Sequence, residues 1–351
     1  MLTDWREQSL GDLLRRHGLD GSPEQPFSHD GWSGAALTAI ERGAERFVVK
    51  RTSWATDWIV RATRDRAIRE GWVAANVSLG PGLVAPYLGA AADGDAVALV
   101  MPDLSTELIP WDRPGLHQVI GPSVVDRVMG AMARLHLEDW GEGLPWCPLE
   151  DRLLLLARPS AERYVAQGLP VGERFLAGWD AFDRWAPAPA RQLVDRLSRD
   201  PAPLIAALGR LPEVSLHGDL KLANVALLDV DVALIDWQMA CRAPVPVELG
   251  WFLVSNVALL PEGPEPIVGR YREAVRSSGN GGYAGGASRD ARLLGDWAAQ
   301  VDLTWIVGLL LRGWRKGLDA ASETPTGWGT SAADDLAWWC ARAIEAADRR
   351  L

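Results

Sequence analysis

A run of eight residues constrains this chain more than any other feature: it reads His217-Gly218-Asp219-Leu220-Lys221-Leu222-Ala223-Asn224, and Asp236 follows twelve residues after its end. A short apolar run precedes it, and two more, at 225–228 and 232–235, separate Asn224 from Asp236. Short apolar runs bounded by turn residues are typical of strands. A hairpin formed by the two later runs would bring Asn224 and Asp236 to the same end.

The polar residues of this segment suit phosphoryl transfer. A carboxylate such as Asp219 can orient an acceptor hydroxyl and take its proton. The side-chain oxygens of Asn224 and Asp236 are hard ligands of the kind that Mg²⁺ accepts beside a triphosphate. Two other interpretations stay open from the residues alone. One is a structural polar turn in which His217 bonds to a carbonyl; the other is a metal hydrolase, for which a second histidine cluster is missing.

Taken together, the two parts of the pattern resemble the family of aminoglycoside phosphotransferases and choline kinases, which is marked by HGDxxxxN and a later aspartate in an Ile-Asp-Trp or Ile-Asp-Phe context. The resemblance covers about residues 27–260. It implies an α+β, two-lobed protein-kinase-like fold, with a strand-rich N-lobe and a mainly helical C-lobe. It also implies roles for four residues: a catalytic base (Asp219), two magnesium ligands (Asn224 and Asp236) and a structural member of the loop (His217).

The chain departs from the family pattern in the segment after Asp236. Where the family has Asp-Leu-Ala, this chain has Glu248-Leu249-Gly250. A glutamate thus replaces the aspartate, and the hydrogen bonding of that loop is an open question. Further upstream, Leu135-His136 resembles the end of a family helix, and we expect His136 to pack and to form hydrogen bonds.

The strand-rich first hundred residues contain a candidate phosphate-binding lysine. Lys50 closes the apolar run 47–49, as the strand-three lysine of kinases does. Glu70 falls on the next predicted helix, residues 57–77, and can pair with Lys50 to fix its position. The alternative is that each is an ordinary solvated charge.

Two further segments of this part are candidates for nucleotide contacts. The turn that contains Gly31 and Gly34 can bring backbone N–H groups close to phosphates, but it is not a full GxGxxG, and an ordinary hairpin turn explains it equally well. Pro102 and Leu104 lie where the family has its interlobe hinge. Because Pro102 has no N–H, its carbonyl and the amide of Leu104 are expected to read the adenine edge. Neither a Walker A nor a Rossmann motif occurs in suitable context.

Lys221 follows the expected base by two residues and resembles the lysine of protein-kinase catalytic loops. We predict a catalytic role in which it neutralises the transferring phosphoryl group. A lysine that only faces solvent is the alternative. Because DFG and APE signatures are absent, Lys221 does not indicate a protein kinase.

Composition narrows the classes of partner. A formal net charge of −10 argues against nucleic-acid binding, which needs clustered Lys and Arg, and it weakly favours a cationic acceptor. The three cysteines lack the spacing of metal sites and disulfide frameworks, so a reducing cytoplasm is the expected location. No uninterrupted apolar run reaches eighteen residues, and therefore no membrane span is expected.

We expect two lobes. Residues 1–103 would form the nucleotide-binding N-lobe, with an N-terminal helix, an antiparallel sheet and one further helix; residues 104–351 would form the helical C-lobe with the catalytic loop. The nucleotide is expected between them. The C-terminal helices would build the acceptor pocket, and four residues there are candidate ligand contacts or ordinary packing residues: Asp296, Asp302, Trp305 and Trp314.

The sequence therefore predicts an ATP- and Mg²⁺-dependent phosphotransferase that acts on a hydroxyl of a small molecule, cationic or sugar-like, such as an amino sugar, an aminoglycoside or an amino alcohol. A nucleotide-binding pseudokinase or scaffolding protein without turnover is the alternative of a different class. A kinase for a protein substrate is a third hypothesis. Fold resemblance licenses a reaction type and leaves the acceptor and the oligomeric state open.

Overall fold

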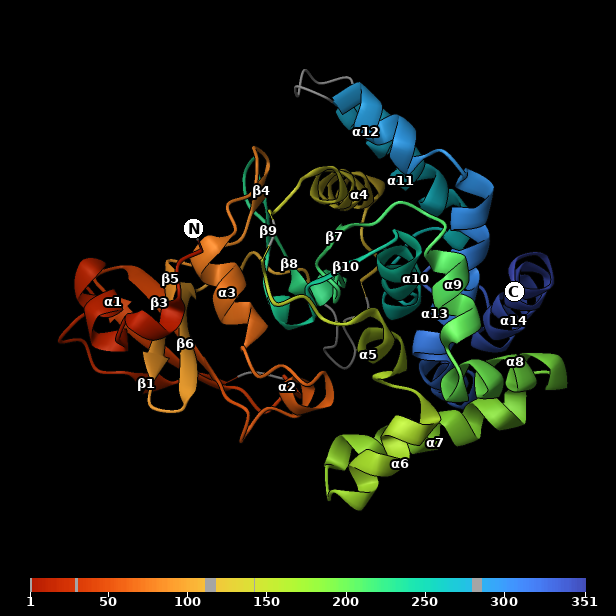
Figure 1. Ribbon diagram of the computed structural model, residues 1–351, viewed down its shortest axis with the longest axis horizontal. Coiled ribbons are helices and arrows are strands. Elements are labelled where there is room, and N and C mark those ends of the chain that lie inside the picture. The colour runs from red at the N-terminus through yellow and green to blue at the C-terminus, as the bar shows by residue number, and fades with distance from the viewer. Residues whose placement is uncertain (1, 29–30, 111–117, 142, 280–285) are drawn as a thin grey trace. The chain divides into compact units, whose positions relative to one another are not determined.

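The computed structural model describes residues 2–28, 31–110, 118–141, 143–279 and 286–351 (Figure 1). The chain packs into two compact units, each formed from three segments of sequence. Unit 1 comprises Met1–Ile109, Trp140–Cys147 and Asn224–Ala240. Unit 2 comprises Pro110–Asp139, Pro148–Ala223 and Cys241–Leu351. The strands of unit 1 and the many helices of unit 2 give the chain an α+β fold.

Unit 1 is built on a five-stranded antiparallel sheet with the order β1-β2-β3-β6-β5. Its helices and strands are η1 (Trp5–Glu7), α1 (Leu10–Arg16), β1 (Gln25–Pro26), β2 (Ala36–Arg42), β3 (Glu45–Thr52), α2 (Trp58–Ala62), α3 (Arg69–Asn76), β4 (Leu83–Val84), β5 (Gly89–Asp93), β6 (Ala96–Pro102), β8 (Val225–Leu227), β9 (Val232–Leu234) and η3 (Trp237–Met239).

Both faces of the middle of this sheet are buried, which explains the uninterrupted apolar residues 47–49 of β3 and 96–101 of β6. Successive side chains of a strand point to opposite faces. Val49 packs with Leu13 of α1 in one cluster, while Val48 packs in a second cluster with Val60 of α2 and Ile68. Lys50, two residues after Val48, therefore points to the second face.

The single helix predicted at 57–77 is wrong, because the chain forms two short helices there. Asp57 caps α2 by accepting hydrogen bonds from the N–H groups of Ile59 and Val60. Between the helices Ile68 has a positive φ of 52°, which a helix cannot contain. Asp65 then accepts a hydrogen bond from the N–H of Arg69 and starts α3.

A second, three-stranded sheet of unit 1 has the order β4-β9-β8. The predicted hairpin is present: β8 and β9 are antiparallel, with Val225 opposite Leu234. Residues 83–90 are divided between two sheets. Leu83 and Val84 run parallel to β9, whereas the strand that pairs with β6 is β5.

Unit 2 consists mainly of helices, with one two-stranded sheet of β7 and β10. Its elements are α4 (Pro122–Leu137), α5 (Leu149–Leu154), α6 (Arg158–Ala166), α7 (Pro170–Trp185), α8 (Ala188–Arg199), α9 (Ala202–Leu208), β7 (Val214–Leu216), β10 (Cys241–Ala243), α10 (Pro246–Ser255), α11 (Pro264–Gly279), α12 (Gly286–Leu293), α13 (Trp297–Ala321) and α14 (Ala332–Arg350). A short 3-10 turn, η2 (Leu222–Asn224), forms the last three residues of the motif 217–224.

The long helix α13 forms the centre of unit 2, packing against α7, α10 and α14. Its contact with α7 is close enough to require glycine. A Cβ built on Gly317 would lie 2.3 Å from the backbone nitrogen of Phe182, and one on Gly178 would lie 2.6 Å from the carbonyl oxygen of Trp314. Two helices, α12 and α13, precede the last helix of the chain, α14, so the C-terminal part is helical as the sequence predicted.

Within the described residues, no helix is both long and apolar enough to cross a membrane.

We predict opposite effects on stability for two glycine-to-alanine changes, one at the contact of α13 with α7 and one on an open helix face. Gly317→Ala should lower the free energy of unfolding by about 1–3 kcal/mol, because its methyl group would force the two backbones apart. Gly269→Ala in α11 meets nothing within 4 Å and should raise it by about 0.5–1 kcal/mol, as expected for a helix interior. Urea denaturation measures both; a Gly317→Ala variant as stable as the wild type would contradict the packing described.

Candidate functional site

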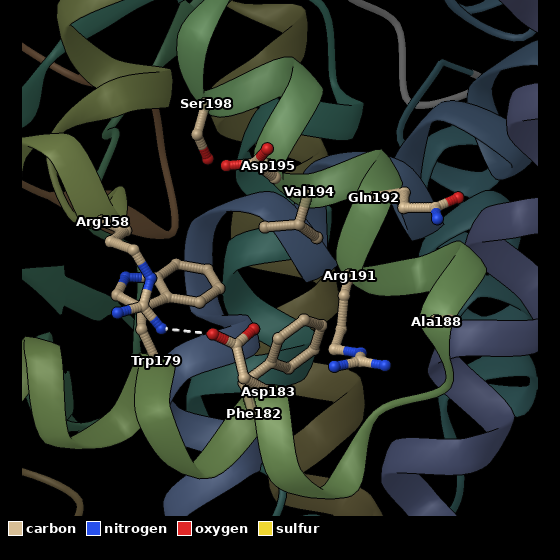
Figure 2. A pocket seen from close by; sticks show the side chains of 10 residues that line it. All are labelled: Arg158, Trp179, Phe182, Asp183, Ala188, Arg191, Gln192, Val194, Asp195 and Ser198. Atoms are coloured by element: carbon tan, nitrogen blue, oxygen red, sulfur yellow. Dashed lines mark hydrogen bonds and ion pairs between the residues drawn. The ribbon is translucent and has the colours of Figure 1, made fainter.

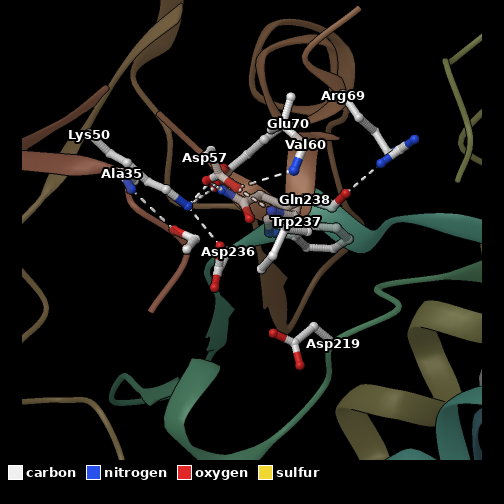
Figure 3. A network of polar contacts seen from close by, with 12 residues as sticks. Ala35, Lys50, Asp57, Val60, Arg69, Glu70, Asp219, Asp236, Trp237 and Gln238 are labelled. Atoms are coloured by element: carbon white, nitrogen blue, oxygen red, sulfur yellow. Dashed lines mark hydrogen bonds and ion pairs between the residues drawn. The ribbon is translucent and has the colours of Figure 1, made fainter. Parts of the chain in front are cut away.

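Unit 1 holds a buried lysine between two carboxylates. The Lys50 Nζ, on β3, lies 2.8 Å from Oε2 of Glu70 on α3 and 2.7 Å from Oδ1 of Asp236 (Figure 3). The expected pairing of Lys50 with Glu70 is thus confirmed, and Asp236 is a second partner. The open alternative of two solvated charges is wrong for these residues, since Lys50 and Glu70 are 8% and 1% exposed.

The charges of this cluster stabilise one another. Burial alone would lower the pKa of Lys50, but the carboxylates of Asp236 and Glu70 outweigh burial and raise it. Burial raises the pKa of Glu70 although Lys50 opposes the shift. Lys50 therefore stays protonated at neutral pH.

Sequence reasoning missed four side chains that support this cluster. The hydroxyl of Tyr87 donates a hydrogen bond of 2.8 Å to Glu70, and burial together with the charge of Glu70 raises the pKa of that tyrosine. Gln238 donates through Nε2 to Asp57, and Arg69 donates to the carbonyl oxygen of Gln238 (Figure 3). Each is a single residue inside a helix or loop, with no motif or spacing to single it out.

The segment after Asp236 is therefore held by buried polar groups. Asp236 itself has φ 68° and ψ 63°, a left-handed conformation uncommon for a residue other than glycine. Such a conformation persists when its surroundings fix it. Here Trp237 donates its indole N–H to the carbonyl of Leu234, and Gln238 is bonded as described.

Asn224 and Asp236 lie at the same end of the β8–β9 hairpin, because the N–H of Ile235 donates to the carbonyl oxygen of Asn224 at 3.1 Å. Asn224 is buried and the Asp236 side chain is 30% exposed. Among the described residues, no group of three or more His, Cys, Asp and Glu side chains could hold a metal ion. Two oxygen donors nevertheless fit Mg²⁺, which in nucleotide sites takes one or two protein ligands and phosphate oxygens.

In unit 2, residues 217–223 of the HGDxxxxN motif follow β7. Asp219 accepts a hydrogen bond of 2.9 Å from Lys221 through Oδ2, so this lysine is paired with the expected base. The next residue, Leu222, donates its N–H to Oδ1 of Asn256 at the end of α10. The loop is thus attached to the end of α10 directly after Lys221.

Glu248 of α10 is fully buried and bonds to the backbone of the loop. Its Oε1 accepts the N–H of Gly218 at 2.6 Å; its Oε2 accepts the N–H of His217 at 3.3 Å and Nε2 of His136 at 2.9 Å. The hydroxyl of Tyr271 lies 2.8 Å from the other ring nitrogen of His136. The glutamate thus provides the loop's hydrogen bonds, and His136 has the packing and bonding role that the sequence predicted.

Burial alone would raise the pKa of Glu248, but the hydrogen bond and charge of His136 and the N–H of Gly218 outweigh burial and lower it. The carboxylate is therefore ionised at neutral pH and can accept all three hydrogen bonds.

The remaining candidates for nucleotide contacts also lie in unit 1. Gly34 has a positive φ of 94°, and a Cβ on it would lie 2.4 Å from the carbonyl oxygen of Thr56, so packing alone requires glycine there. Gly31 precedes it in the same loop. Pro102 ends β6, and the carbonyl of Leu104 accepts hydrogen bonds from the next turn of chain.

The four C-terminal candidates have structural roles. Asp296 caps α13, and Asp302 pairs with Arg349 and Arg350. Trp305 and Trp314 are 3% and 1% exposed. Of the two alternatives, ligand contact and an ordinary packing role, the structure supports the packing role.

A pocket of about 390 Å³ lies among α6, α7 and α8 (Figure 2). Arg158 spans part of it, donating to Asp180 and Asp183. Its ten lining residues include none of the residues of the catalytic-loop motif: they are Arg158, Trp179, Phe182, Asp183, Ala188, Arg191, Gln192, Val194, Asp195 and Ser198.

A family model, that of the phosphotransferase enzyme family, matches residues 29–287, which is more than half of the chain and includes the whole polar pattern. The chain belongs to the phosphotransferase enzyme family. No curated protein has a significant sequence match to it.

Solved structures similar to this phosphotransferase include an aminoglycoside-3'-phosphotransferase of type VIII, with 22% identity over 81% of this chain and 97% of the other and a TM-score of 0.41. A choline kinase from Cryptosporidium parvum has 11% identity over 98% and 94% of the two chains and a TM-score of 0.48. A spectinomycin phosphotransferase has 14% identity over 97% and 98% and a TM-score of 0.44. The family match, rather than these likenesses, carries the assignment.

The network of Glu248 predicts a pH-dependent loss of stability. Glu248→Gln leaves buried donors without an acceptor and should lower the free energy of unfolding at pH 7 by about 1–3 kcal/mol. Because the folded-state pKa of Glu248 is depressed, the contribution is present above its ordinary value of 4.5 and is lost as the pH falls through the folded pKa. The difference between wild type and variant should therefore shrink below about pH 4.5.

Urea denaturation between pH 3 and pH 8 tests this prediction. The control is Glu173→Gln, which changes an exposed glutamate of α7. A wild type and a Glu248→Gln variant that differ equally at all pH values would contradict an ionised Glu248.

Proposed function

We propose that this phosphotransferase uses Mg²⁺ and ATP to phosphorylate a hydroxyl group of a small molecule. The observation that carries the proposal is the buried ion pair of Lys50 and Glu70, joined by Asp236. In kinases a strand lysine paired with a helix glutamate positions the nucleotide phosphates, and an aspartate holds the metal. This chain has those residue types in contact, within the segment that the family model matches.

Asp219 is the proposed catalytic base. The acceptor hydroxyl oxygen forms a bond to the γ-phosphorus, while the bond from that phosphorus to the β–γ bridging oxygen breaks. ADP leaves with the electron pair of that bond, and Asp219 takes the hydroxyl proton. Lys221, which is bonded to Asp219, neutralises charge on the transferring phosphoryl group.

The nucleotide is assigned to unit 1 residues. Lys50 would contact phosphate oxygens, and the loop of Gly31 and Gly34 would offer backbone N–H groups to them. The carbonyl of Pro102 and the amide of Leu104 would read the adenine edge. In this proposal residues 1–103 are the nucleotide-binding lobe, and residues 104–351 carry the catalytic loop and the acceptor pocket.

Asn224 and Asp236 would hold Mg²⁺, which when bound supplies positive charge to the phosphates. The acceptor would be a small-molecule alcohol; the enzymes with similar structures include aminoglycoside and spectinomycin phosphotransferases. We assign the protein to a reducing cytoplasm, because its three buried cysteines form no disulfide in the described part of the chain.

The base assignment predicts that Asp219→Asn keeps nucleotide binding and loses transfer by about 10²–10⁴-fold, the usual contribution of a general base. ADP release from Mg-ATP measures turnover across amino sugars, aminoglycosides, simple sugars, hydroxy acids and amino alcohols, and calorimetry measures ATP binding. Turnover with one acceptor that the variant loses would support the proposal. An unchanged rate would refute Asp219 as the base; ATP binding without turnover on any acceptor would favour the nucleotide-binding alternative.

The metal assignment predicts a magnesium-specific defect in Asp236→Ala. Nucleotide affinity in the presence of Mg²⁺ should fall at least on the order of tenfold, the loss seen even for groups that only support a metal ligand. Affinity measured with EDTA should change much less. Asp229→Ala, an exposed residue at the far end of the same hairpin, is the matched control. An equal loss with and without Mg²⁺ would show that Asp236 acts on the nucleotide site without the metal.

A further inference from the structure

Unit 2 contains arginines next to the catalytic loop that the proposed transfer step does not use. Arg152 of α5 and Arg312 of α13 both stack on the ring of Trp251, with guanidinium carbons 4.3 Å and 4.7 Å from its centre. Arg312 also lies 5.1 Å from the ring centre of Trp314. Stacking on indoles holds the planes of these guanidinium groups in place.

Arg152 is fully buried and incompletely bonded. Its Nε donates a 2.7 Å hydrogen bond to the carbonyl oxygen of Gly218, the residue before the proposed base. Both terminal nitrogens are buried and have no hydrogen-bond acceptor in the described part of the chain. A buried, incompletely paired guanidinium is costly, and such groups usually have a water or an anion as a partner.

Arg312 presents the accessible part of this pair. It is partly exposed, and among the described residues it forms no ion pair with any carboxylate. Burial and the charges of Arg315 and Arg152 lower the pKa of Arg312 to about 9, although Asp219 and Asp319 act in the opposite direction. Arg312 is still protonated at neutral pH, in a site with surplus positive charge.

The nearby carboxylates do not balance that charge. Asp319 pairs with Arg315 at 2.8 Å, and Asp219 pairs with Lys221 at 2.9 Å. Because both carboxylates are paired with other cations, the positive charges of Arg152 and Arg312 are not neutralised by them. A cationic acceptor that approached Asp219 from this side would be repelled, whereas an anion would gain charge-assisted hydrogen bonds.

We propose that Arg312, with Arg152 stacked on the same indole of Trp251, forms an oxyanion subsite that binds a carboxylate or phosphate group of the acceptor. The acceptor is then an alcohol that carries a negative charge, such as a sugar acid, a hydroxy acid or a sugar phosphate. This inference rests on the proposed function, whose acceptor class it narrows, and it differs from the cationic acceptor that the net charge weakly favoured.

A binding experiment tests the subsite without requiring turnover. Calorimetric titration with gluconate, glucose, inorganic phosphate and ADP is carried out on wild type, on Arg312→Met, which keeps an apolar stem, and on Arg199→Met, an exposed control in α8. We expect wild type to bind gluconate or phosphate, and Arg312→Met to bind it about 10- to 100-fold more weakly, as for loss of a charge-assisted hydrogen bond. Arg199→Met should match wild type.

Three results of that titration would overturn the subsite. They are no binding of either oxyanion to wild type, equal binding by Arg312→Met, and a loss of ADP affinity in Arg312→Met as large as the loss for gluconate or phosphate. The last result would mean that the arginine reads the nucleotide. Arg152→Met is not required for the decision, because that residue also supports Gly218 and its variant can fail to fold.

A turnover experiment separates this inference from the proposed function. ADP release is compared for matched acceptors: gluconate and glucose 6-phosphate against glucose, and glycerate against glycerol. We expect turnover with acidic members only, and a KM raised about 10- to 100-fold in Arg312→Met with kcat little changed. The carboxylate and phosphate members distinguish the two oxyanions. Turnover of choline or an amino sugar that Arg312→Met leaves intact would refute the subsite while the kinase function stands.

Discussion

The proposed catalytic loop depends on the buried carboxylate of Glu248. It binds the N–H groups of two successive loop residues, and the guanidinium of Arg152 binds the carbonyl of Gly218. Both backbone polar groups of Gly218 are therefore fixed by buried side chains from two helices. With φ +80°, this position is in the left-handed region, where glycine avoids the steric cost of a side chain. The direction in which the following residue, Asp219, leaves the loop is set by these contacts, since a backbone clamped at N–H and C=O has little freedom left.

Unit 1 uses the same device at the end of its hairpin. Asp236 adopts a strained backbone conformation, and the residues after it are bonded by Asp57 and Arg69 from the two short helices. Lys50 then joins Asp236 to Glu70 on α3. The break between α2 and α3 is part of this arrangement, because it lets each helix supply a different polar side chain to the hairpin end.

Contiguous motifs made much of this predictable from sequence. Two short apolar runs separated by a turn located the hairpin that joins Asn224 to Asp236. Residue order alone suggested that Lys50 pairs with Glu70. Supporting residues such as Tyr87 and Arg152 could not be found that way, because they are isolated in sequence and reach the site only through tertiary packing. The helix break at Ile68 and the parallel pairing of β4 with β9 were missed for a similar physical reason. Local propensity does not report a long-range partner or a capped turn that overrides it.

The net charge of the chain does not predict the charge that a ligand meets at one site. The chain as a whole is acidic, with a formal net charge of −10, and charges that are exposed to solvent act on a ligand through that solvent. At physiological salt such interactions are screened beyond about 8–10 Å. Arg312 and Arg152, in contrast, are held on an indole beside the loop, where burial reduces that screening. The sign of charge that an acceptor meets is therefore decided by these few fixed groups, and an acidic protein can present a basic site.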